Sequence, residues 1–133
     1  MKKDEKIFSF QDLKVWHKAV QFAKEVIRTI DEFDAPRKHY RLIEQLESAS
    51  ASVAMNIAEG KGRQTTKEFI QFLYIARGSV FEVITLLIIL QEVGWIEINK
   101  VKELQGLGEE ITKMINSLIK SMKYRGQKRG SLQ

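Results

Sequence analysis

The stretch from Gln45 to Arg63, QLESASASVAMNIAEGKGR, constrains the fold of this chain more than any other segment. Its serine and alanine side chains are small, and small side chains let a second helix approach closely. Gly60 and Gly62 follow at the position where a helix C-terminus commonly carries glycine. The segment therefore predicts a helix that packs tightly on a neighbour and ends at Gly60, and it contains no cluster of residues that indicates a reaction.

The rest of the sequence also predicts long helices. The chain has 133 residues, the length of one ordinary domain, and its single proline leaves helices almost uninterrupted. Apolar spacing predicts that Leu13, Trp16, Val20, Ala23, Ile27 and Ile30 form the buried stripe of the first helix. We expect helices over about residues 11–31, 37–59, 66–93 and 99–123, the third starting with the capping-box pattern Thr65–Glu68. Four such helices predict an all-α, antiparallel up-down-up-down four-helix bundle over residues 1–123.

The third helix is apolar on nearly every side from Val80 to Leu90. A helix of this kind is buried on all sides, which is difficult to achieve in a monomer of four helices. We therefore expect one of its faces to contact another subunit of a homo-oligomer. Its most apolar run, Val83 to Leu90, is far shorter than the roughly 20 residues that span a bilayer. With no signal-peptide pattern at the N-terminus and no cysteine, we expect a cytoplasmic protein without membrane association.

Positive charge is concentrated at the C-terminal end of the chain. All 17 acidic residues lie at or before Glu110, whereas residues 111–133 carry a charge of +6 and no acid. We expect residues 124–133 to form a flexible basic tail. Basic side chains bind nucleic-acid phosphates and an aromatic ring stacks on a base, so the candidate nucleic-acid-binding residues are Lys113, Lys120, Lys123, Tyr124, Arg125, Lys128 and Arg129. The alternative is a tail that only keeps the protein soluble.

A second candidate group surrounds the glycine-rich turn and consists of Asn56, Glu59, Lys61, Arg63 and Glu82. We expect Glu82 to be buried and paired with Asn56, Arg63 or a helix-end amide, because an unpaired buried carboxylate is costly. The group is then a structural clasp that fixes the register of two helices. The alternative is an anion site, because Lys61 and Arg63 precede a helix N-terminus.

Metal-binding and catalytic patterns are weak in this sequence. His17 and His39 have no second ligand at helical spacing, so we expect no metal and no cofactor. The serines have no histidine or lysine spaced to activate them, which does not support a catalytic residue or a small-molecule substrate.

Several motifs of this chain occur together in a known family. They are the segment Phe10–Trp16 (FQDLKVW), the pairs Gln45-Leu46 and Ser52-Val53, the segment Asn56–Gly60 (NIAEG), the segment Phe69–Ser79 (FIQFLYIARGS), and Glu82. In combination they resemble the small bacterial four-helix-bundle proteins related to the intervening-sequence proteins of large-subunit rRNA genes. The resemblance extends from about Phe10 to Met122.

This resemblance implies a bundle that assembles as a ring, typically a homopentamer. It also implies kinship to the accessory protein of diversity-generating retroelements, which binds nucleic acid and a reverse transcriptase, although the function of most of the family is undefined. The family often has basic residues directly after the Gln-Leu pair, where this chain has Glu47 and Ser48. We therefore place the expected nucleic-acid surface at the C-terminal end and not on the second helix.

Together, these observations predict a non-enzymatic oligomeric scaffold that binds RNA, DNA or a nucleic-acid enzyme through basic surfaces. The first alternative is a protein–protein interaction module with no nucleic-acid role. The second is an enzyme or small-ligand binder that uses Asn56, Arg63 and Glu82.

Overall fold

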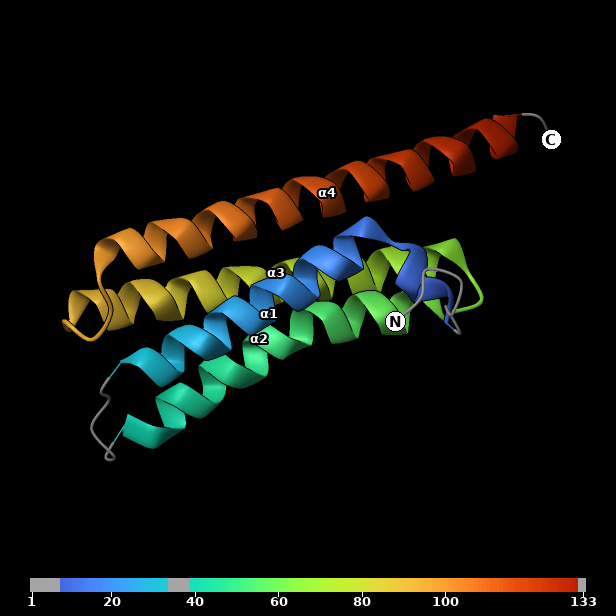
Figure 1. Cartoon of the computed structure of the whole chain (residues 1–133). Helices are drawn as coiled ribbons and strands as arrows, with labels where there is room; N and C mark the ends of the chain where they lie inside the picture. Colours follow the sequence, from blue (N-terminus) through green and yellow to red (C-terminus); the bar gives the residue numbers. More distant parts are fainter. Residues whose placement is uncertain (1–7, 34–38, 132–133) are drawn as a thin grey trace.

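The structure, a computed structural model, describes residues 8–33 and 39–131, with side chains as far as Gly126. A short 3-10 helix, η1 (Ser9–Asp12), precedes four α-helices: α1 (Lys14–Glu32), α2 (Tyr40–Lys61), α3 (Thr66–Glu92) and α4 (Ile98–Ser131) (Figure 1). The described residues contain helices and no strand, so the predicted all-α four-helix fold is confirmed.

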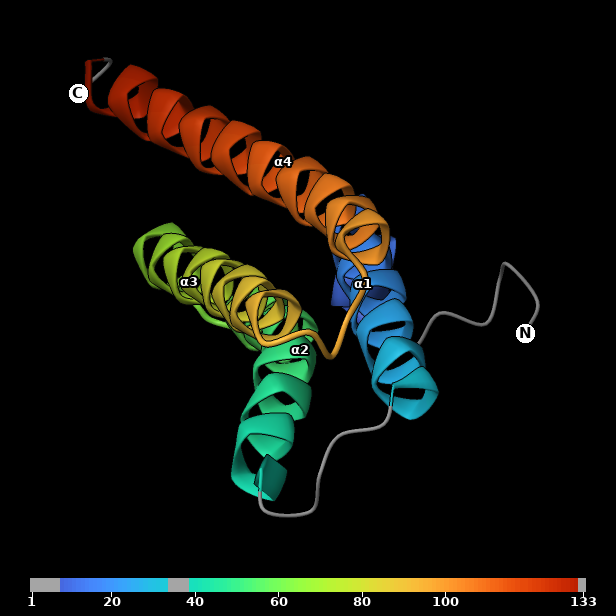
Figure 2. The same cartoon turned by 90° about the vertical axis from the view of Figure 1, so that its left-hand side faces the viewer.

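The helices surround one apolar core. The C-terminal end of α1, the N-terminal end of α2 and the α3–α4 turn lie at one end of the molecule, and the α2–α3 turn lies at the other (Figure 1). In the end-on view, α1 and α4 lie on one side, with α2 and α3 on the other (Figure 2). The largest fully buried side chains come from all four helices: Phe22, Val26, Leu46, Val53, Ile57, Leu73, Val80, Leu87, Leu90, Leu104, Ile111 and Ile115.

Helix α1 buries a different face from the one that the apolar spacing predicts. The buried residues are Val15, Ala19, Phe22, Val26 and Thr29, whereas the predicted stripe residues Val20 and Ile27 are 41% and 39% exposed. Two neighbouring apolar stripes run along this helix, and the phenyl ring of Phe22 in the core selects one of them. The stripe prediction for α1 is therefore wrong by one residue position.

Helices α2 and α3 approach each other closely at Gly60. A methyl group built on Gly60 would lie 2.6 Å from Cβ of Phe72 and 3.0 Å from Cδ1 of Phe69. Further along the interface, the hydroxyl groups of Ser52 and Ser79 share a hydrogen bond of 2.9 Å. The predicted close packing of α2 is thus confirmed, but Gly60 does not end the helix. It lies inside α2, which continues to Lys61, and the absence of a side chain serves the packing.

Helix α3 begins and ends as predicted. The hydroxyl oxygen of Thr65 accepts a hydrogen bond of 3.1 Å from the backbone N–H of Glu68. At the other end, Gly94 has φ of +86°, while the N–H of Gly94 bonds to the carbonyl of Gln91 and that of Trp95 to the carbonyl of Leu90. This is a Schellman ending, and a glycine adopts the required left-handed conformation without strain.

The whole of α3 is long and apolar enough to cross a membrane, judged by length and composition alone. The Val83–Leu90 run by itself is too short to do so. The core helix of a soluble protein passes the same test, so this property is weak evidence. In the bundle, α3 contributes the buried side chains of Leu73, Val80 and Leu87 to the core.

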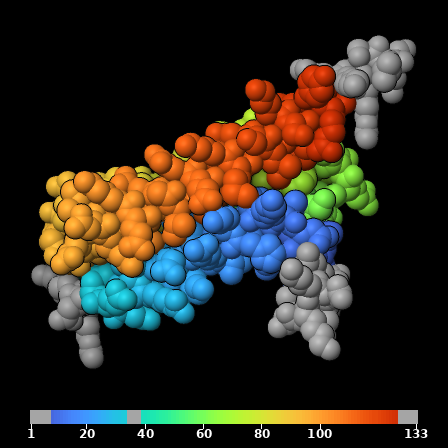
Figure 3. Space-filling view, turned by 45° about the horizontal axis from the view of Figure 1, so that its top comes forward, coloured from blue at the N-terminus to red at the C-terminus, as the bar shows by residue number. Residues whose placement is uncertain are grey.

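Helix α4 is longer than predicted. It continues to Ser131 instead of ending at residue 123, so the segment predicted as a flexible tail has a helical backbone as far as it is described. Lysine, arginine and glutamine are good helix formers, and basic residues near a helix C-terminus interact favourably with the helix dipole. The last turns of α4 extend past the α2–α3 turn (Figure 1), while the space-filling view shows α4 lying along α1 (Figure 3).

Candidate functional site

A groove between α3 and the C-terminal half of α4 brings together cations and tyrosines. We call it the basic–aromatic groove; it is about 420 Å³ in volume and is lined by Tyr74, Arg77, Asn116, Ile119, Lys120, Lys123 and Tyr124. Since α3 and α4 run in opposite directions, Tyr74 lies beside Lys123, and Arg77 lies beside Asn116. The lining contains three cations and no carboxylate.

Arg77 is held in one orientation by contacts from both helices. Its Nη1 atom donates a hydrogen bond of 2.8 Å to Oδ1 of Asn116. Its guanidinium lies 4.9 Å from the ring centre of Tyr74 and 5.9 Å from that of Phe81. Cation–π contacts and a hydrogen bond fix the planar group, which has five N–H donors in all, so further donors are available to a ligand.

Lys123, on α4, contacts Tyr74 on the α3 side of the groove. Its Nζ atom donates a hydrogen bond of 2.9 Å to the hydroxyl oxygen of Tyr74 and lies 5.5 Å from the centre of that ring. This hydrogen bond, together with the positive charges of Lys123 and Arg77, lowers the pKa of the Tyr74 hydroxyl below its ordinary value. The shift is a sign that the groove favours negative charge.

Some basic residues elsewhere in the bundle are neutralised by a carboxylate. Lys18 pairs with Glu110 at 3.2 Å, and Arg63 pairs with Glu59 at 2.7 Å. Within the described part of the chain, Arg77, Lys120 and Lys123 form no salt bridge. The arrangement can therefore bind an anion, and its tyrosine rings add a surface for a flat apolar group.

The structure brings together only part of the predicted basic set. Lys120, Lys123 and Tyr124 line the groove, whereas Arg125 faces a separate hollow beside Lys61 at the end of the bundle. Lys113 lies further along α4, and the side chains of Lys128 and Arg129 are outside the described residues.

Sequence reasoning missed Tyr74, Arg77 and Asn116. One signal was available, because Tyr74 and Arg77 are three residues apart and therefore share a helix face. Their pairing with α4 depends on the register of two helices, which the sequence pattern does not determine.

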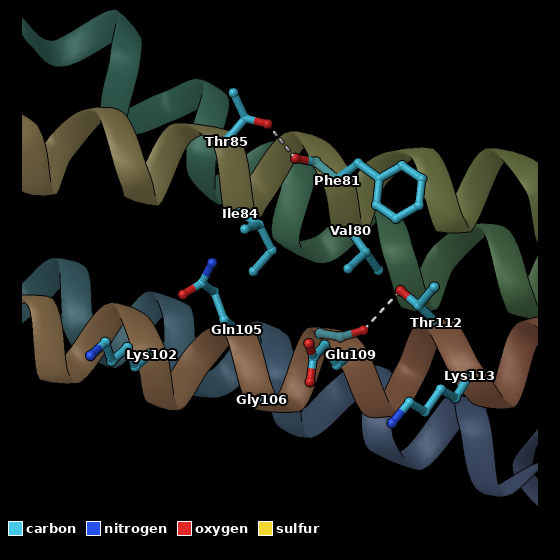
Figure 4. A pocket seen from close by; sticks show the side chains of 11 residues that line it. Val80, Phe81, Ile84, Thr85, Lys102, Gln105, Gly106, Glu109, Thr112 and Lys113 are labelled. Carbon is cyan, nitrogen blue, oxygen red and sulfur yellow. Dashed lines mark hydrogen bonds between the residues drawn. The ribbon is translucent and has the colours of Figure 1, made fainter.

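A second, larger groove of about 630 Å³ lies further along the same two helices (Figure 4). Val80 and Ile84 point from α3 toward α4, where Gly106 and Gly108 present no side chain. A methyl group on Gly108 would lie 3.2 Å from both Val80 and Ile84, so this glycine sets the separation of the helices. We call it the apolar groove; charged side chains at its edge come from Lys102, Glu109 and Lys113.

The second predicted candidate group is not brought together as a site. Arg63 bonds to Glu59 and stacks over the ring of Phe72 at 4.7 Å, while Lys61 lies 5.9 Å from the ring centre of Phe69. The side-chain amide of Asn56 donates to the backbone carbonyl and the hydroxyl oxygen of Ser52.

The predictions of burial and partner for Glu82 are wrong. This carboxylate is exposed and accepts a hydrogen bond of 3.1 Å from Nε2 of Gln45. The contact links α2 to α3 on the exposed side of α3. In the described residues, no three histidine, aspartate or glutamate side chains gather where they could hold a metal ion.

Comparison with known proteins identifies relatives but no function. A crystal structure of a protein of unknown function from the S23 ribosomal protein family of Bacteroides thetaiotaomicron VPI-5482 has a TM-score of 0.71 and 24% identity, covering 80% of this chain and 98% of that one. At this identity the likeness shows the fold alone. No curated protein matches the sequence. Residues 11–117 match the family described as 23S rRNA-intervening sequence protein, and the chain therefore belongs to this family.

Proposed function

We propose that this chain is a non-enzymatic cytoplasmic scaffold that binds nucleic acid. Each subunit is an antiparallel up-down-up-down bundle, and the subunits assemble as a ring, a pentamer by resemblance to the family. The observation that carries the proposal is the basic–aromatic groove, in which Arg77, Lys120 and Lys123 lie together without a carboxylate. Cations that have no carboxylate partner supply the salt-sensitive phosphate binding on which most nucleic-acid affinity depends.

The helical extension of α4 supports the same interface. Its last turns carry Lys128 and Arg129, and residues 111–133 contain no acid. Because the C-terminal end of α4 extends past the α2–α3 turn, it lies at one end of the molecule (Figure 1). In a cyclic ring the same end of every subunit lies on the same side, so the positive fields of the subunits add.

The outer side of α3 supports assembly. Five large apolar residues are exposed there, and we call them the outer face of α3: Ile75, Phe81, Ile88, Ile89 and Val93. Phe81 and Ile88 are seven residues apart, a spacing typical of helices that pack along a shared seam. Most of this face lies toward the C-terminal end of α3, away from the groove at Tyr74, so a neighbouring subunit can cover it and leave the groove open.

Size-exclusion chromatography coupled to light scattering tests both parts of the proposal. The protein alone should elute near five times 15.4 kDa, and a short random-sequence RNA or DNA at low salt should raise this mass. High salt should release the nucleic acid and leave the ring intact. A monomer that ignores nucleic acid would contradict both parts.

One observation favours a second candidate function. The apolar groove offers a protein partner an apolar surface next to the basic–aromatic groove. A ring that forms but binds no nucleic acid at low salt would favour this protein-interaction module over the scaffold that binds nucleic acid.

A further inference from the structure

We propose that the basic–aromatic groove binds one unpaired nucleotide of a single-stranded nucleic acid, with the base on the ring of Tyr124 and its phosphate at Arg77 and Lys123. This inference rests on the proposed function and deepens it, since it states which form of nucleic acid the groove recognises. It depends on three features of the groove: an uncovered aromatic ring, an oriented guanidinium and a volume that suits one nucleotide.

The two tyrosines of the groove are not equivalent. The ring of Tyr74 has two cations over it, at 4.9 Å for Arg77 and 5.5 Å for Lys123. Tyr124 is 65% exposed, and no aromatic or cationic group of the described chain packs on its ring. Tyr124 therefore offers the more accessible face on which a base can stack, and exposed aromatic rings beside cations are the common feature of proteins that bind single strands.

The phosphate position follows from Arg77 and Lys123. One N–H of Arg77 is used by Asn116 at 2.8 Å, which orients the remaining donors of the guanidinium. Lys123 lies within hydrogen-bond distance of Tyr74, the ring over which Arg77 stacks, so the two cations flank the same side chain. Guanidinium groups bind phosphate oxygens through paired N–H donors, and a lysine adds a point charge. Lys120 lines the same groove and can contact the next phosphate of the strand.

A duplex would leave much of this arrangement unused. Its bases are stacked inside the helix, so it can offer phosphates to the cations but no free base face to Tyr124. Single strands present splayed bases that stack on aromatic side chains. The volume of about 420 Å³ lies within the range of small-ligand pockets, which suits a single nucleotide.

An acidic peptide is the main competing ligand, because it would also satisfy the cations. It has no flat base for Tyr124, so the effect of removing this ring separates the two ligands. Tyr40 provides a matched control: it is 62% exposed, lies on α2 and is not part of the groove.

The experiment measures fluorescence anisotropy at low salt with the full chain. The probes are a labelled single-stranded DNA, the RNA of the same sequence, the matching duplex, and polyglutamate as a competitor. We expect tighter binding of both single strands than of the duplex. Tyr124→Ala should weaken single-strand binding roughly 5- to 100-fold, the effect of losing one stacked base, while Tyr40→Ala should not change it.

The outcomes distinguish this inference from the proposed function. Equal affinity for single strand and duplex, with no effect of Tyr124→Ala, would overturn the inference while leaving nucleic-acid binding intact. A second contrary result is that polyglutamate displaces the labelled single strand at the same concentration as an unlabelled single strand does. That result would also overturn the inference, because the groove would then select charge alone. If no nucleic acid binds at low salt, the proposed function fails together with the inference.

Discussion

Replacement of Gly60 by alanine tests the close approach of α2 and α3. In an ordinary helix interior, glycine to alanine stabilises the helix by about 1 kcal/mol. At Gly60 the new methyl group would lie 2.6 Å from Cβ of Phe72, an atom fixed to the backbone of α3. Overpacking of this kind costs about 1–3 kcal/mol, and the short contact places Gly60 toward the upper part of that range. We therefore expect a net loss of about 1–2 kcal/mol in the free energy of unfolding.

Gly106→Ala is the matched control for this substitution. It lies inside α4, and a methyl group there would meet nothing within 4 Å, so the same chemical change should stabilise the protein by up to about 1 kcal/mol. Both variants are compared with the original protein by urea denaturation at one protein concentration, because the apparent stability of an oligomer depends on concentration. If Gly60→Ala stabilises the protein as much as Gly106→Ala does, the reasoning about helix separation is refuted.

Three further predictions follow from single contacts. Lys123→Met should raise the pKa of Tyr74, because the hydrogen bond and the positive charge that lower it are lost; the difference between phenolate absorbance titrations with and without Tyr74→Phe isolates this group, and an unchanged pKa would contradict the contact. Ile89→Glu should break the ring into folded monomers in light scattering, because a charge is placed on the outer face of α3, whereas Met55→Glu on the exposed surface of α2 should leave the ring intact. Glu82→Gln, made in the monomeric Ile89→Glu variant, should change the free energy of unfolding by less than about 1 kcal/mol, because an exposed amide oxygen can still accept from Gln45; a loss of several kcal/mol in denaturation would indicate a buried charge instead.

Local sequence signals predicted the helices well. Thr65 and Gly94 lie at the two ends of α3 in the structure. Such signals are readable from sequence because a side-chain cap and a left-handed glycine each act on backbone groups only a few residues away. The small residues of α2 correctly predicted a close neighbour. The role of Gly60 was misjudged because glycine serves both helix ends and close packing, and the choice depends on whether Phe72 lies opposite.

Tertiary packing explains the main errors. Helix α1 has two adjacent apolar stripes, and only the position of Phe22 among the other helices shows which one is buried. Glu82 was expected inside because its sequence neighbours are apolar, but it lies on the side of α3 that also exposes Ile75 and Ile89. An excess of apolar residues on α3 was thus predicted correctly, while its distribution around the helix was not.

In the candidate site, too, sequence reveals the local features but not the contacts between helices. The basic character of the C-terminal end was visible in the charge distribution, and three of the residues predicted from it, Lys120, Lys123 and Tyr124, line one groove. Arg77 and Tyr74 come from a helix more than thirty positions earlier, and they join the group only because α3 and α4 pack in one particular register. The segment after residue 123 was expected to leave the helix because it has no apolar pattern, yet its backbone continues α4, and lysine, arginine and glutamine are good helix formers.

The salt dependence of single-strand binding tests the central claim most directly. Lys120→Gln/Lys123→Gln removes two cations of the groove, and Lys24→Gln/Lys67→Gln removes two exposed cations elsewhere, so both double variants carry the same net charge. The slope of log affinity against log salt should become less steep by about 1.4 in the groove variant, at about 0.7 for each lost phosphate contact, and should stay unchanged in the control. Equal slopes for the two double variants would show that net charge, and not the groove between α3 and α4, determines binding.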